Sequence, residues 1–185
     1  MASALSTLSF SFAFNPTWTA KVNVTGLSGA IQNQNNLNKT ISLSTSASDA
    51  AANGASQLYY AQVTLAGAAS TTIDLSSFTD IVGRTAQSMA RIKAWYFRLL
   101  NSTDDSSITT TPSSFSVGNA AANAHALGLS VATTTRDFVP GDSQGWATQS
   151  AAGLVVDGTH KNIKILNNDA SVTGYMDVLI VGGYA

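Results

Sequence analysis

Few residues in this chain are of the types that commonly perform catalysis or bind metals. There are two histidines, His125 and His160, and no cysteine, which excludes disulfides, thiol catalysis and cysteine-ligated metal sites. Neither histidine lies in an HExxH pattern or a comparable metal-binding spacing. His160 follows the turn signal Asp157-Gly158, where a solvated loop histidine is the default interpretation. The pattern therefore favours structural roles for both histidines.

The other candidate chemistry would use serine and aspartate side chains. Serines are abundant but the GxSxG motif is absent, although members of a Ser-His-Asp triad can lie far apart in a chain. Asp104, Asp105 and Asp142 could bind Ca²⁺, but no calcium-loop pattern surrounds them and turn formation explains them better. No glycine-rich loop leads into a helix, as phosphate binding requires. We therefore expect no enzyme activity, no catalytic residues, no metal and no cofactor.

The charge content is the most informative property of the composition. Asp, Glu, Lys and Arg make up 10% of the chain and the net charge is -1, against about 25% charged residues in a typical soluble domain. A surface with so little charge repels copies of itself weakly, which favours a protein covered by identical subunits. Lys21 and Lys39 are the only cations in residues 1–57, too few for an arm that neutralises nucleic acid. We expect no direct nucleic-acid binding through this segment.

Alternation of apolar and polar residues recurs along almost the whole chain and predicts β-strands. Near the start, residues 8–14 alternate Leu or Phe with Ser or Ala, and no basic region precedes them, which favours a strand over a secretory signal peptide. No stretch is long and apolar enough to span a bilayer, so we expect no membrane partner. Further strands are predicted at 58–65, 71–75, 114–117, 126–131, 137–139, 153–156, 162–166 and 175–181.

Two segments fit more than one secondary structure. Residues 76–90 contain the one plausible helical turn, with Ser77 or Thr79 as a cap and Gly83 as an interruption. Residues 91–100 fit a helix or a strand, but their β-branched and aromatic content favours a strand, which would be central because both faces are apolar. The strand would place Ile92, Ala94 and Tyr96 on one face and Trp95, Phe97 and Leu99 on the other.

About ten short strands with at most one short helix predict an all-β fold, an antiparallel β-sandwich of the jelly-roll type. No exact internal repeat is present, which disfavours a solenoid or a propeller. We expect residues 58–185 to form the sandwich. Residues 1–57 are expected to be an N-terminal strand or arm with a small-residue linker, able to reach a neighbouring subunit.

Five segments of the C-terminal two-thirds share their pattern with a known group of proteins. They are TTIDLSSFTDIVGRT (71–85), ARIKAWYFRLLN (90–101), FSVGNAAANAH (115–125), FVPGD (138–142) and THKNIKILNNDASVTGYMDVLIVGG (159–183). On these segments the chain resembles single-jelly-roll structural proteins of phages and prokaryotic viruses, of the capsid, decoration or head-fibre type. The resemblance implies a component of a virion, made in the host cytoplasm, with copies of itself and other virion proteins as partners.

The leading functional hypothesis is a structural protein that assembles with copies of itself into a virus- or phage-like particle through symmetric contacts. An apolar strand at 8–14 would invite uncontrolled pairing unless assembly buries it. Tryptophans in predicted loops near Pro or Gly could anchor an interface or stack on sugars, so the alternative is a carbohydrate-binding or adhesin module. The candidate interface residues are Leu8, Phe10, Phe12, Phe14, Trp18 and Trp146.

Overall fold

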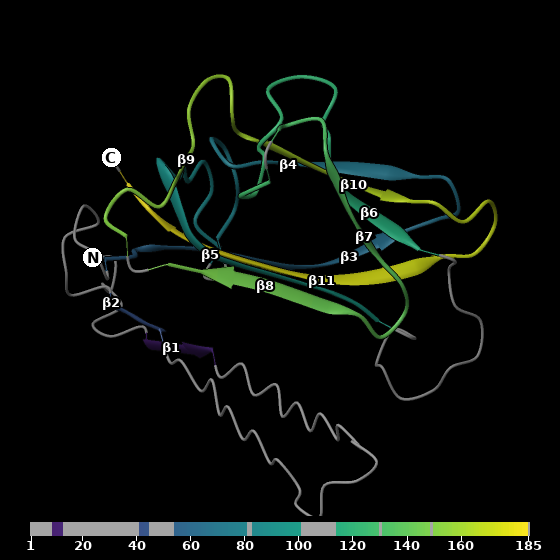
Figure 1. Cartoon of the computed structure of the whole chain (residues 1–185), viewed down its shortest axis with the longest axis horizontal. Coiled ribbons are helices and arrows are strands. Elements are labelled where there is room, and N and C mark those ends of the chain that lie inside the picture. Colours follow the sequence, from purple (N-terminus) through teal and green to yellow (C-terminus); the bar gives the residue numbers. More distant parts are fainter. Residues whose placement is uncertain are drawn as a thin grey trace, which may run out of the picture.

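The computed structural model describes residues 9–12, 41–44, 54–80, 83–100, 114–129, 131–148 and 150–184. The secondary structure in these ranges consists of strands, and the ranges contain no helix that could cross a membrane. The strands, labelled in Figure 1, are β1 (Ser9–Phe12), β2 (Ile41–Ser44), β3 (Gln57–Leu65), β4 (Ser70–Asp74), β5 (Arg91–Leu99), β6 (Phe115–Gly118), β7 (Thr135–Phe138), β8 (Ser143–Ala147), β9 (Leu154–Val155), β10 (Asn162–Asn167) and β11 (Gly174–Gly183).

Two antiparallel sheets form the body of the protein. One has the order β4-β10-β6-β7, and the other has the order β3-β11-β5-β8 with β9 also paired to β5. Figure 1 shows these sheets as two stacked layers. Most connections cross from one layer to the other, which is the connectivity of a jelly roll. The predicted all-β sandwich is therefore confirmed, while β1 and β2 pair only with each other among the described strands.

The core lies between the two sheets because alternate side chains of each strand point inward. In the four-stranded sheet, Phe115 lies opposite Phe138 on β7, and both rings are completely buried. Phe138 also meets Phe97 of the other sheet, with ring centroids 6.1 Å apart. The inner positions of the five-stranded sheet include Tyr59, Val63, Leu65, Ile92, Trp95, Phe97, Leu99, Met176, Val178 and Ile180.

The ambiguous segment 91–100 forms the central strand β5, between β11 and β8. Its pairing with β11 shifts register, because Ala94 lies opposite Val181 while Ile92 lies opposite Gly182. One extra residue, Lys93, therefore forms a β-bulge. The bulge turns Ile92 into the core beside Trp95, so the predicted grouping of Ile92 with Ala94 and Tyr96 on one face is wrong.

Two other sequence-based expectations are also wrong. The described part of residues 126–131 forms no strand, because Leu127 and Gly128 adopt positive φ angles of 51° and 79° and reverse the chain. The described part of residues 76–90 contains no helix. Instead, Phe78 and Gln87 exchange two backbone hydrogen bonds of 2.9 Å, which pair the ends of this segment as a bridge.

Polar contacts tie the two sheets together at the margins of the core. Asn167, at the end of β10, is completely buried, and its Nδ2 donates to Leu65 O at 3.1 Å and to Val172 O at 2.8 Å. On the opposite side, the Arg136 guanidinium lies 4.8 Å from the centroid of the Trp95 ring. Because Leu65 and Trp95 belong to the other sheet, both contacts fix how the layers sit on one another.

The close approach of β11 to the start of β5 gives a stability prediction. A Cβ at Gly182 would collide with the Arg91 carbonyl oxygen and the Met89 side chain, whereas a Cβ at Gly158 would meet open space. We expect Gly182→Ala to lower the free energy of unfolding by about 1–3 kcal/mol, as overpacking does. Gly158→Ala should change it by less than about 0.5 kcal/mol. Urea unfolding of both variants measures this, and equal midpoints would contradict it.

Candidate functional site

His125 is buried at 4% exposure and both of its ring nitrogens are engaged. The Leu127 backbone N–H donates to Nδ1 at 3.0 Å, so Nδ1 is unprotonated and the proton lies on Nε2. Nε2 therefore donates to Val155 O at 3.1 Å. Burial lowers the pKa of His125, which favours this neutral form. The residue joins the loop after β6 to β9 and serves as a structural link.

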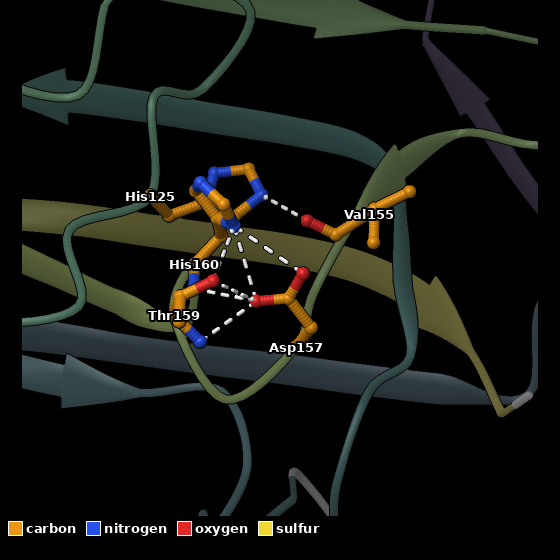
Figure 2. A network of polar contacts seen from close by, with 5 residues as sticks. All are labelled: His125, Val155, Asp157, Thr159 and His160. Atoms are coloured by element: carbon orange, nitrogen blue, oxygen red, sulfur yellow. Dashed lines mark hydrogen bonds and ion pairs between the residues drawn. The ribbon is translucent and has the colours of Figure 1, made fainter.

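His160 lies near His125 on the turn between β9 and β10, as Figure 2 shows. Asp157 Oδ1 accepts hydrogen bonds from the Thr159 hydroxyl at 2.8 Å and from the backbone N–H groups of Thr159 at 2.7 Å and His160 at 2.9 Å. The bonds from the Thr159 hydroxyl and the Thr159 backbone N–H, together with the contact of the His160 side chain, lower the pKa of Asp157 to about 2. The arrangement is an aspartate-capped turn, as the Asp157-Gly158 signal predicted.

The Thr159, His160 and Asp157 side chains contain the residue types of a catalytic triad but not its geometry. In a triad the histidine uses one ring nitrogen for the nucleophile and the other for the carboxylate. Here the Thr159 hydroxyl and Asp157 Oδ1 both lie 3.0 Å from the same nitrogen, His160 Nδ1. This arrangement cannot pass a proton from the hydroxyl through the ring, and it stabilises the turn instead.

Of the three aspartates considered for calcium, the structure describes Asp142. Asp142 accepts a hydrogen bond from the Val139 N–H at 3.1 Å, which closes the turn between β7 and β8. Asp104 and Asp105 lie outside the described residues. No group of three His, Asp or Glu side chains suited to holding a metal ion occurs in the described ranges.

The outer face of the five-stranded sheet is the most distinctive surface of the sandwich. The inner positions of β11 belong to the core, so alternation places its other side chains on the outer face. Registers across β3, β11, β5 and β8 align these side chains in three rows. The apolar row is Leu58, Val181, Ala94 and Ala147; the tyrosine row is Tyr60, Leu179, Tyr96 and Gly145; the polar row is Gln62, Asp177, Arg98 and Ser143.

These rows change from buried and apolar to polar along the strands. In the apolar row, Leu58 is 4% exposed and Val181 is 2% exposed, and together with Ala55 they form a second apolar cluster separate from the core. In the tyrosine row, Tyr60 is 48% exposed. The outer face of this sheet therefore carries apolar and aromatic side chains, where an antiparallel sheet commonly turns polar residues to water.

A buried lysine on β5 binds the backbone of residues 150–151 beside one end of this face. Lys93, the bulge residue, is completely buried, and its Nζ donates to Ser150 O at 2.7 Å and to Ala151 O at 3.0 Å. Arg91 Nη1 donates to the same Ala151 oxygen at 2.8 Å. Hydrogen bonds from charged donors are strong, so residues 150–151 are held against β5.

The sequence-predicted interface residues are distributed unevenly. The sequence predicted a loop at Trp146, but the residue lies in β8 opposite Trp95, where it is half-buried against the core. In β1, Phe10 pairs with Leu43 and Phe12 with Ile41 on β2. Leu8, Phe14 and Trp18 lie outside the described residues. An interface role for these six residues stays a prediction.

The tyrosine row was not recognised from the sequence. Its signal is that β11 is apolar at both alternating positions near its end, with Leu179 and Val181 beside Val178 and Ile180. A strand that is apolar in both phases has two covered faces. The sequence of β11 alone does not show which residues of neighbouring strands align with it. The observed registers place Tyr60 and Tyr96 on either side of Leu179.

Comparisons with known proteins identify no family. No family model matches the chain, and no curated protein matches it. One solved structure, described as "Bacillus endospore appendages form a novel family of disulfide-linked pili", is similar over 70% of this chain and 90% of its own length. The identity is 14% and the TM-score is 0.32, values too low to support an argument about fold or function.

The geometry of His125 predicts a dependence of stability on pH. Burial lowers the pKa of folded His125 below the usual 6.5, so below about pH 6.5 the unfolded chain binds a proton that the folded chain does not. The free energy of unfolding should therefore fall as the pH drops from about 6.5 towards 5. Protonation would also make Nδ1 a donor and break its bond from Leu127 N–H.

Urea unfolding of two variants at several pH values tests this assignment. In His125→Asn, the side-chain oxygen can accept from Leu127 N–H but cannot take up a proton, so we expect lower stability at pH 7 and a shallower decline on acidification. His160→Asn is the matched control, because His160 is exposed on its turn, and it should keep the decline of the unmodified protein. Parallel pH profiles for the unmodified protein and His125→Asn would contradict the assignment.

Proposed function

We propose that this protein is a structural subunit that acts by assembling with copies of itself. The observation that carries the proposal is the outer face of the five-stranded sheet, where the tyrosine row is solvent-accessible at Tyr60. Contiguous apolar and aromatic groups on a surface favour association with a partner. The chain has 10% charged residues, so little electrostatic repulsion opposes the approach of an identical copy.

The distribution of polar groups on this face suits a specific contact. The polar row follows the tyrosine row, and Gln62 Nε2 donates to Asp177 Oδ1 at 3.4 Å within it. Interfaces combine an aromatic centre with a polar margin whose hydrogen bonds set orientation. A face with this gradient can therefore bury tyrosine side chains while its margin stays hydrated.

We further propose that the assembly is a virion component, in a shell, decoration or fibre role. The support for this setting is the resemblance of segments 71–85, 90–101, 115–125, 138–142 and 159–183 to phage structural proteins. A jelly roll suits this role because two packed sheets form a rigid block with loops at both ends. We also propose that the protein is not an enzyme, since the Thr159, His160 and Asp157 side chains lack the geometry of a triad.

Self-assembly predicts that the purified protein forms larger species as its concentration rises. Since few charges are present, the distribution of species should change little between low salt and about 0.5 M salt, where surface charges are largely screened. Light scattering coupled to size-exclusion chromatography measures the masses, and negative-stain electron microscopy shows their form. A protein that stays monomeric over the whole concentration range would contradict the proposal.

A pair of tyrosine variants tests the face itself. Tyr96→Ser removes a ring from the centre of the tyrosine row and should weaken self-association about tenfold or more, as loss of an aromatic interface anchor does. Tyr184→Ser is the matched control, because Tyr184 is 43% exposed and lies outside the three rows. Equal association of the two variants, with both folded by circular dichroism, would exclude the tyrosine row from the contact.

A further inference from the structure

The two sheets present four edges in the part of the chain that the structure describes. The four-stranded sheet ends at β4 and β7, and the five-stranded sheet ends at β3 on one side and at β8 with β9 on the other. An edge strand exposes a row of unpaired backbone groups that can pair with another chain. Soluble proteins protect such edges with charges, proline, bulges or short strands.

Three of these edges carry such protection. The β7 edge contains Arg136 and Asp137, and the β4 edge contains Asp74, whose Oδ2 lies 3.1 Å from Lys161 Nζ. The third edge is broken, since β8 has five residues, β9 has two, and residues 148–153 separate them. A strand added to the β4 or β7 edge would bury a charged side chain. A strand added along β8 and β9 would lose its backbone hydrogen bonds where residues 148–153 interrupt the edge.

The β3 edge has none of these features. Its nine residues, QLYYAQVTL, include no charged residue, proline or glycine. Its register with β11 runs from Gln57 to Leu65 without a bulge. Tyr60, Gln62 and Thr64 are exposed along it. Gln57, Leu58 and Leu65 are buried, so residues 59–64 present about 20 Å of regular backbone edge. This run makes β3 the edge most open to pairing.

We propose that β3 pairs antiparallel with β3 of a second copy across a two-fold axis, joining two five-stranded sheets into one. This inference rests on the proposed self-assembly and adds an edge contact at β3 to the contact of the outer face. A second β3 is the occupant because it offers the same uncharged run of residues 59–64, with no charge to desolvate. The competing strands of another copy are shorter, interrupted or charged: β8 with five residues, β4 with Asp74 and β7 with Arg136 and Asp137.

The pairing extends the surface described above. Tyr60 lies at the β3 end of the tyrosine row, so a two-fold axis at β3 brings the tyrosine rows of both copies into one sheet face. An isologous contact of this kind uses the same patch twice. Cross-strand partners then include only uncharged side chains, so no like charges are placed opposite each other.

Lysine substitutions at matched edges test the location. Tyr60→Lys with Thr64→Lys places two cations per copy on the β3 edge. We expect this double variant to raise the dimer dissociation constant at least about tenfold. Ser70→Lys with Thr72→Lys is the control, since both residues are exposed on the β4 edge. This control variant should change the dimer dissociation constant by less than about twofold. Sedimentation equilibrium gives the constants, with circular dichroism to confirm folding.

Cysteine cross-linking tests the symmetry, and the chain suits it because it contains no cysteine. Single cysteines are introduced in turn at positions 60 to 64. Only a residue near a two-fold axis can form a disulfide with its own counterpart, whose Cα atoms must lie within about 7 Å. We expect one or two adjacent positions to give a covalent dimer on mild oxidation, and Thr72→Cys to give none.

The outcomes separate this inference from the proposed function. If the unmodified protein assembles and the β3 lysine variant assembles equally well, the β3 contact is wrong and self-assembly stands. If a β3 cysteine cross-links only to a copy carrying Gln144→Cys on β8, the contact is head-to-tail. That result would overturn the two-fold pairing of β3. If the unmodified protein is monomeric at every concentration, the proposed function fails first.

Discussion

The pairing of β11 with β3 on one side and β5 on the other is the interaction on which the rest of the structure depends. It aligns the core positions of three strands against the second sheet, and by the same alternation it aligns the apolar, tyrosine and polar rows on the outer face. The strand also requires close contact at its end, where Gly182 leaves room for the Arg91 carbonyl and Met89. Because residues 174–183 must find residues 57–65 and 91–99, the sheet closes only when distant parts of the chain meet, a topology associated with slow folding.

Alternation was sufficient to predict several of the strands. The predicted strand at 58–65 became β3, that at 162–166 became β10 and that at 175–181 became β11, each with small changes in its bounds. It failed where a local polar contact overrides the pattern. Residues 126–131 read as a strand, but the His125 side chain accepts the Leu127 N–H and bends the chain away. It also missed β8, whose sequence SQGWA contains one large apolar residue and owes its strand to pairing with β5.

The outer surface of the five-stranded sheet was less predictable than the fold. The histidines are conspicuous in the sequence because they are rare, yet the structure employs His125 as a buried link and His160 in a turn capped by Asp157. The tyrosine row combines residues from β3, β11, β5 and β8, so it exists only after register is set. A single extra residue at Lys93 also separates Ile92 from Ala94 and Tyr96, with which it was predicted to share a face, and turns it into the core. Alternation identifies which residues share a face of one strand, but the partners across strands come from tertiary pairing.

The two faces of this sheet therefore differ in what covers their apolar side chains. The inner face packs against the second sheet, whereas on the outer face the apolar row is buried within the chain and Tyr60 beside it is exposed. The buried Lys93 and neighbouring Arg91 fix residues 150–151 beside β5, so the broken β8 and β9 edge is held in place. Protection by geometry at that edge, and by charge at β4 and β7, leaves one regular edge unprotected. For the proposed β3 contact, in a chain with 10% charged residues, the choice of edge depends on where pairing is blocked more than on electrostatic attraction.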